Sequence, residues 1–172
     1  MTKCPFALGL LASVLPLLST WAINEATPVD QLNVKEGFQV ELLYSVPKEE
    51  QGSWVSICTD PKGRFIVSDQ YGSLYRFHPP AAGEKLAKDA IEKIDLPIGQ
   101  SHGLLYAFDS LYCIVSNDEY EGRGLYRVRD TDGDDKFDNV EQLLKLEQGG
   151  EHGPHSVVLS PDGQSLNVIV GN

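Results

Sequence analysis

Cysteine is scarce in this chain, and no Cys-x-x-Cys-His motif is present. Without that motif, no c-type haem attaches to these residues. The cysteines are Cys4, Cys58 and Cys113, and the last two lie inside apolar, strand-like runs. We expect both to be buried thiols, although an exported protein could also join them in a disulfide.

Basic residues are also few: 14 Lys and Arg stand against 25 Asp and Glu, which gives a net charge of −11. A surface with a net negative charge repels the phosphates of nucleic acids, which argues against a nucleic-acid partner. It favours the binding of cations or neutral substrates.

The sequence lacks helical periodicity, and it contains only one long apolar run. No segment keeps apolar residues at the i, i+3, i+4, i+7 spacing of an amphipathic helix. The apolar run, residues 6–18, is shorter than the roughly 20 residues that span a bilayer. Lys3 precedes it and Thr20-Trp21-Ala22 follows it. Residues 1–22 therefore have the pattern of a secretory signal peptide, with an uncleaved signal anchor as the alternative.

Cleavage would remove Lys3, the only charge in that segment, and bring the net charge to −12. We therefore expect an exported protein, periplasmic or at the cell surface, with no membrane span after cleavage. Residues 23–36 form a polar lead-in, and residues 37–172 are expected to form the folded domain.

Repeated strand–turn–strand units are what the sequence does contain. Asp60-Pro-Lys-Gly63 and Ser160-Pro-Asp-Gly163 each lie between two apolar runs. Proline sets φ at the first central turn position and glycine accepts a positive φ, so both predict tight hairpins. A third hairpin is expected at Phe108-Asp109-Ser110. The resulting repeat of about 50 residues is in the range of a propeller blade.

Short strands of this kind fill the rest of the chain. Leu74-Tyr-Arg-Phe77 and Leu125-Tyr-Arg-Val128 are near-copies at the same place in two successive units. The predicted strands are a first one at 37–44; a unit at 54–59, 64–68, 73–77 and 91–96; a unit at 103–108, 111–116, 124–128 and 140–146; and a partial unit at 156–160 and 166–170.

The repeat predicts an all-β fold, a partial β-propeller of about two and a half four-stranded antiparallel blades. A two-sheet sandwich is the alternative for a domain of this length. Propellers have at least about four blades, so we expect this chain to be part of a longer protein.

Two histidines precede the first strand of the third unit. In a propeller this strand lines the central channel, where a neutral imidazole of His152 or His155 could act as a general base. A loop histidine that hydrogen-bonds nearby backbone is the alternative. His102 holds in the second unit the place that His152 holds in the third, so it either faces the same channel or caps its own blade.

An acidic loop is the other local motif. Carboxylates at positions 1, 3, 5, 9 and 12 match a calcium-binding loop of the EF-hand type. Asp135 occupies position 6, where glycine normally makes the sharp turn, and no helices flank the loop. We expect a structural calcium site in a hairpin, with a solvated acidic turn as the alternative. The five candidate ligands are Asp130, Asp132, Asp134, Asp138 and Glu141.

The segment that contains His152, Pro161, Asp162 and Gly163 resembles the catalytic-histidine segment of soluble quinoprotein glucose and sorbosone dehydrogenases. The resemblance implies a six-bladed propeller in which His152 accepts the hydroxyl proton of a sugar while hydride passes to pyrroloquinoline quinone. Ser156 departs from the family pattern, which has Arg or Gln there. The arginines and lysine that hold the quinone in that family would lie beyond residue 172.

A broader set of motifs resembles the membrane-bound dehydrogenases of planctomycetes and their relatives, large exported proteins. The resemblance implies that the propeller precedes helical repeats and a c-type cytochrome domain. The expected function is therefore the N-terminal part of an exported quinoprotein-type sugar or alcohol dehydrogenase; the alternative is a non-catalytic, calcium-stabilised propeller that binds glycans or a partner protein. The motifs are Gly52-Ser-Trp-Val-Ser56, Asp60-Pro-Lys-Gly-Arg64, residues 67–76, residues 102–112, Arg129-Asp-Thr-Asp-Gly-Asp134 and Glu151-His-Gly-Pro-His155.

Overall fold

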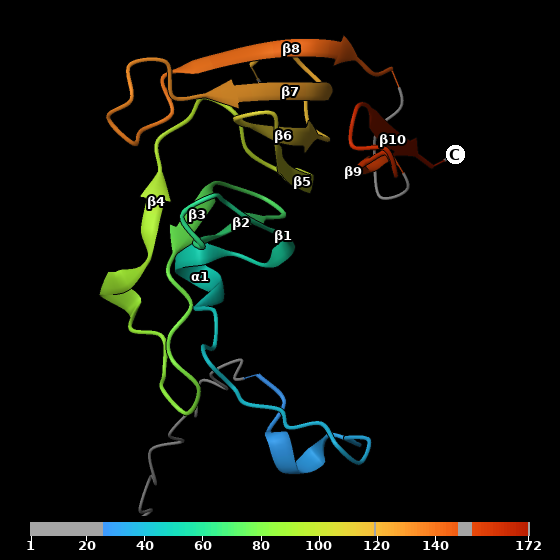
Figure 1. The fold of residues 1–172 in the computed structure, drawn as a ribbon. Helices are drawn as coiled ribbons and strands as arrows, with labels where there is room; N and C mark the ends of the chain where they lie inside the picture. The colour runs from blue at the N-terminus through green and yellow to red at the C-terminus, as the bar shows by residue number, and fades with distance from the viewer. Residues whose placement is uncertain (1–25, 119, 148–152, 172) are drawn as a thin grey trace, which may run out of the picture.

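The protein is described by a computed structural model that covers residues 26–118, 120–147 and 153–171. Strands dominate these residues and form three antiparallel sheets (Figure 1). The predicted signal peptide, residues 1–22, and His152 lie outside the described residues. Among the described residues, no helix combines the length and the apolar character needed to cross a bilayer.

Each of the first two sheets has four strands joined in the order of the sequence. A short helix, α1 (Lys48–Gln51), and two 3-10 turns, η1 (Val29–Gln31) and η2 (Lys88–Ala90), lie outside the sheets. The first sheet contains β1 (Trp54–Thr59), β2 (Phe65–Asp69), β3 (Leu74–Phe77) and β4 (Glu92–Ile94); the second contains β5 (Ser101–Ala107), β6 (Ser110–Val115), β7 (Gly124–Arg129) and β8 (Asn139–Lys145); β9 (Pro154–Leu159) and β10 (Leu166–Val170) form the third.

The predicted hairpin turns are confirmed. The N–H of Gly63 donates to the carbonyl of Asp60 at 3.0 Å, and Gly163 does the same to Ser160 at 2.9 Å. Both glycines have a positive φ, as this turn requires. Phe108 and Asp109 both adopt a φ of 50°, and they join β5 to β6 through a two-residue loop.

The strand predicted at residues 37–44 is wrong. These residues belong to no sheet, and Phe38 is 73% exposed. Alternation alone does not make a strand, because a strand also needs a neighbour whose backbone groups pair with its own. Here the segment makes one such bond to the loop before η2, from the N–H of Leu86 to the carbonyl of Leu43 at 3.0 Å.

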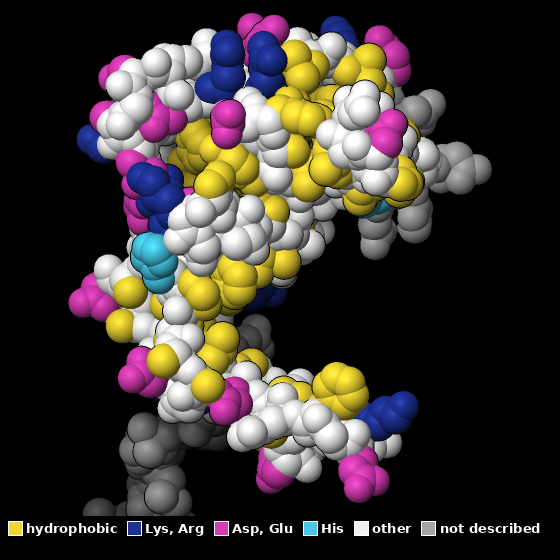
Figure 2. All heavy atoms as spheres, viewed as in Figure 1, with side chains coloured by type: hydrophobic (Ala, Val, Ile, Leu, Met, Phe, Trp, Pro, Cys, Tyr) yellow, Lys and Arg dark blue, Asp and Glu magenta, His cyan; other side chains and the backbone are white. Residues whose placement is uncertain are grey.

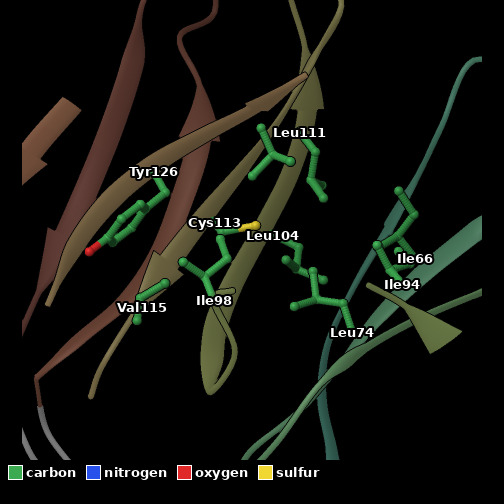
Figure 3. Close-up of a cluster of buried hydrophobic side chains, with 10 residues drawn as sticks. Ile66, Leu74, Ile94, Ile98, Leu104, Leu111, Cys113, Val115 and Tyr126 are labelled. Carbon is green, nitrogen blue, oxygen red and sulfur yellow. The ribbon is translucent and has the colours of Figure 1, made fainter. Parts of the chain in front are cut away.

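The main core lies between the first and second sheets (Figure 3). Ile66 and Leu74 of the first sheet meet Leu111, Cys113 and other apolar side chains of the second, and all of these four are fully buried. Burial of each such side chain contributes about 1.5–3 kcal/mol. This core joins two successive sheets into one body.

The second sheet is covered on both faces. On the face away from the main core, Tyr112 and Ile114 pack against Val157 and Val168 of the third sheet. Every residue of β6 is consequently buried. The sheets meet most closely through their first strands, because β5 contacts both β1 and β9.

Both strand cysteines are free thiols in the apolar interface between the first two sheets. Burial raises the pKa of Cys58 to about 12 and raises the pKa of Cys113 as well. A thiol with a raised pKa is a poor nucleophile and a poor metal ligand. The prediction of a buried thiol is confirmed for Cys113, Cys58 is partly buried, and both are free thiols and not the alternative disulfide.

Candidate functional site

Two of the histidines singled out from the sequence meet in space. His102 is the second residue of β5, and His155 is the second residue of β9. Their rings are stacked, with centroids 5.3 Å apart and planes inclined by 9°. The two Nδ1 atoms lie 3.3 Å from each other. Corresponding positions of two repeated units thus face one another across a boundary between sheets.

A glycine makes this approach possible. A Cβ atom on Gly103 would lie 2.8 Å from the carbonyl oxygen of His155 and 3.0 Å from the Cα of Ser156. These are backbone atoms, which cannot move aside as the end of a flexible side chain can. Ser116 supports the same junction, since its hydroxyl donates to the carbonyl of Pro154 at 2.9 Å. The backbone therefore holds the two imidazoles in place.

The environment keeps His102 neutral. Burial and the nearby His155 lower the pKa of His102, and a hydrogen bond with the backbone of Gln70 acts in the opposite direction. The Nδ1 atom of His102 is the ring nitrogen that faces His155. A neutral imidazole keeps a lone pair on one ring nitrogen, which can accept a proton or bind a metal ion.

A cavity of about 200 Å³ opens in front of the pair, and Val55, Gln70, His102 and His155 line it. The residues come from all three sheets: Val55 from β1, Gln70 from the turn after β2, and the histidines from β5 and β9. The volume is below the about 300–1,000 Å³ of common small-molecule pockets. It suits a hydrated ion or one polar group of a larger ligand.

The acidic loop between β7 and β8 brings three of its five candidate ligands together. One carboxylate oxygen from each of Asp130, Asp132 and Asp138 lies within 4.8 Å of the other two. Asp134 instead accepts a hydrogen bond from the N–H of Lys136 at 2.8 Å. Glu141 lies on β8 and accepts a 2.6 Å hydrogen bond from Arg127.

Position 6 of the loop has a left-handed backbone, although its residue is Asp and not Gly. Asp135 adopts a φ of 72°, the conformation that glycine would take there without strain. The N–H groups of Gly133 and Asp135 both donate to Asp130, at 2.7 and 2.8 Å. Hydrogen bonds from Thr131 hold Asp138 and lower the pKa of its carboxyl.

Asp135 also fastens the loop to the first sheet. Its carboxylate accepts two 2.7 Å hydrogen bonds from the Arg64 guanidinium and forms an ion pair with Lys62 at 2.9 Å. Arg76 donates to the Asp135 carbonyl at 3.0 Å. These cations hold the pKa of Asp135 well below its usual value. Figure 2 shows side chains of opposite charge gathered along this edge of the molecule.

Sequence reasoning missed the contact between Arg64 and Asp135. The two residues are separated by 71 positions, and Arg64 belongs to a turn that local patterns explain without any distant partner. No spacing rule links them. The unusual Asp at position 6 of the loop was the one available signal.

The chain matches no known protein family, and searches of curated proteins and of solved structures also find no match.

Proposed function

We propose that this chain is the N-terminal part of an exported β-propeller protein of the quinoprotein dehydrogenase type, which oxidises a sugar or an alcohol. One observation carries the proposal: His102 and His155 enter a common cavity from the first strands of two successive sheets. In a propeller the first strands surround the central channel. The close approach of β1, β5 and β9 supports that arrangement.

His152 is the proposed general base, on the strength of the family resemblance of its segment. In this role its neutral imidazole takes the hydroxyl proton of the substrate. The quinone that would accept the hydride carries three carboxylates, and the described cavity residues include no Lys or Arg. These four residues do not fit that cofactor, so we assign none of them to holding it.

A reconstitution assay tests the enzyme proposal. The full-length protein, of which this chain is proposed to be the N-terminal part, is incubated with pyrroloquinoline quinone and calcium, and reduction of an electron-accepting dye is followed across a panel of sugars and alcohols. We expect turnover for the wild type, no turnover for His152→Ala, and wild-type turnover for His78→Ala, which alters an exposed histidine. Absence of quinone binding and of dye reduction in the wild type would contradict the proposal.

The same assay addresses the second candidate, a non-catalytic propeller that binds glycans or a partner protein. The small, uncharged cavity favours this candidate, because it can bind one polar group of a ligand without a cofactor. Glycan binding by the wild type without dye reduction would support it. In either case we propose that calcium stabilises the fold.

Calcium is proposed to bind Asp130, Asp132 and Asp138, whose hard oxygen ligands suit this ion. At a concentration about 100 times Kd, calcium should raise the free energy of unfolding by about 2.7 kcal/mol. Urea unfolding with calcium or with a chelator measures this difference. We expect Asp132→Ala to lose it and Asp162→Ala, outside the loop, to keep it. An equal calcium effect in both variants would place the ion elsewhere.

A further inference from the structure

Beyond the proposed function, we infer that His102 and His155 together form a second metal site, which takes a divalent transition ion such as Zn²⁺ through the two Nδ1 atoms. The site differs in chemistry from the acidic loop. It offers imidazole nitrogen instead of carboxylate oxygen, and it lies between the second and third sheets instead of within one hairpin.

The separation of the two nitrogens fits a metal ion. Zinc binds histidine nitrogen at about 2.0–2.1 Å in a tetrahedral arrangement, which places two ligand nitrogens about 3.3–3.4 Å apart. The Nδ1 atoms of His102 and His155 are separated by 3.3 Å. The two imidazoles already have the spacing of a metal-bound pair.

The surroundings orient the rings as metal ligands are oriented in proteins. A metal-binding histidine usually donates its other ring N–H to a carboxylate or a backbone carbonyl, which fixes the tautomer. His102 lies beside the backbone of Gln70, which also lines the cavity and is placed to take this part. Close strand packing at Gly103 sets the position of His155 in turn.

The cavity selects the class of ion. Its four lining residues include no Asp or Glu, so hard cations such as Ca²⁺ and Mg²⁺ find no carboxylate ligands there. Neutral imidazole suits zinc, copper and nickel. The cavity of about 200 Å³ leaves room for water molecules to complete the coordination. A metal ion here would cross-link β5 to β9.

Isothermal titration of the chain with Zn²⁺ as the only titrant tests the site. Excess calcium is present throughout to occupy the acidic loop. We expect one zinc ion per chain, and we expect His102→Ala and His155→Ala each to weaken binding at least tenfold, since loss of a residue that merely hydrogen-bonds to a metal ligand already costs about 10–100-fold in affinity. His78→Ala and Asp132→Ala should bind zinc as the wild type does. Unchanged affinity in both His102→Ala and His155→Ala would overturn the proposal.

Two measurements on the wild-type chain test the site without depending on the folding of the variants. In ¹⁵N-histidine NMR spectra, zinc should shift the Nδ1 resonances of His102 and His155 and leave those of His78 in place. Cobalt(II) should give a tetrahedral visible spectrum without a thiolate charge-transfer band, because Cys58 and Cys113 are packed in the core. Unshifted Nδ1 resonances would mean that the histidines form only a hydrogen-bonded pair.

Discussion

Replacing Arg64 with alanine is expected to lower the free energy of unfolding by about 3 kcal/mol, because removal of one partner from a buried ion pair costs about 3–5 kcal/mol. The Arg64 side chain is 13% exposed, and its partner Asp60 is 3% exposed. The variant leaves the Asp60 carboxylate buried without its cation. It also weakens the attachment of the acidic loop to the first sheet, since Asp135 loses two of its hydrogen bonds and keeps its contacts with Lys62 and Arg76. Urea unfolding gives the difference.

The matched control is Arg127→Ala, which breaks an ion pair of similar geometry on the surface. Arg127 and Glu141 are 31% and 46% exposed. Exposed pairs contribute about 0–1 kcal/mol. Equal losses of stability in the two variants would show that the contact of Arg64 does not join the sheets.

Acid should weaken the wild type through the same contact. The pKa of Asp135 is depressed in the folded protein, so its contribution is fully present above the usual carboxyl pKa of about 4 and is lost as the pH falls toward the depressed value. Without Arg64, the pKa of Asp135 moves back toward its usual value. The unfolding free energy of Arg64→Ala should therefore depend less steeply on pH below about 4.

Substitution at Gly103 is expected to detach the third sheet. Gly103→Val places a side chain against the backbone of β9, and overpacking of this kind typically costs about 1–3 kcal/mol. We expect the upper end of that range, because the displaced atoms are backbone and because Val157 would lose its contacts with β6. Urea unfolding measures the stability, and protection of β9 amides from hydrogen exchange reports the detachment.

The direction in which Gly103→Val changes the free energy of unfolding distinguishes close packing of β5 and β9 from its absence. Valine is favoured over glycine in an ordinary strand, on a propensity scale that spans about 1 kcal/mol. If β5 and β9 did not approach each other closely, Gly103→Val would therefore stabilise the protein. Gly103→Ala should fall between the wild type and the valine variant, because its single methyl group meets the same carbonyl at 2.8 Å.

The turns show how far local patterns reach in this protein. Pro161 fixes its φ and Gly163 accepts a positive φ within the same four residues, so the hairpin between β9 and β10 follows from the sequence alone. The strands that follow each turn alternate or are wholly apolar, which predicts the three antiparallel sheets. Residues 37–44 show the limit of the same reasoning, because an alternating pattern does not specify a partner strand.

The candidate sites show a similar division. Spacing along the chain was enough to predict that Asp130, Asp132 and Asp138 lie close together, because all three belong to one short loop. The 3.3 Å meeting of His102 with His155 depends on two strands from different sheets. The repeat placed His102 and His152 at equivalent positions, whereas the meeting of His102 with His155 required the close packing that Gly103 permits.

Local chemistry in the chain thus specified the hairpins, the strands and the acidic loop, because turn conformation and side-chain alternation act over a few residues. Tertiary structure decided which distant groups became partners: Arg64 with Asp135, and His102 with His155. These pairs form only when burial of apolar side chains draws the sheets together, and that burial is non-directional, so the residue pairs that it joins cannot be read from spacing along the chain.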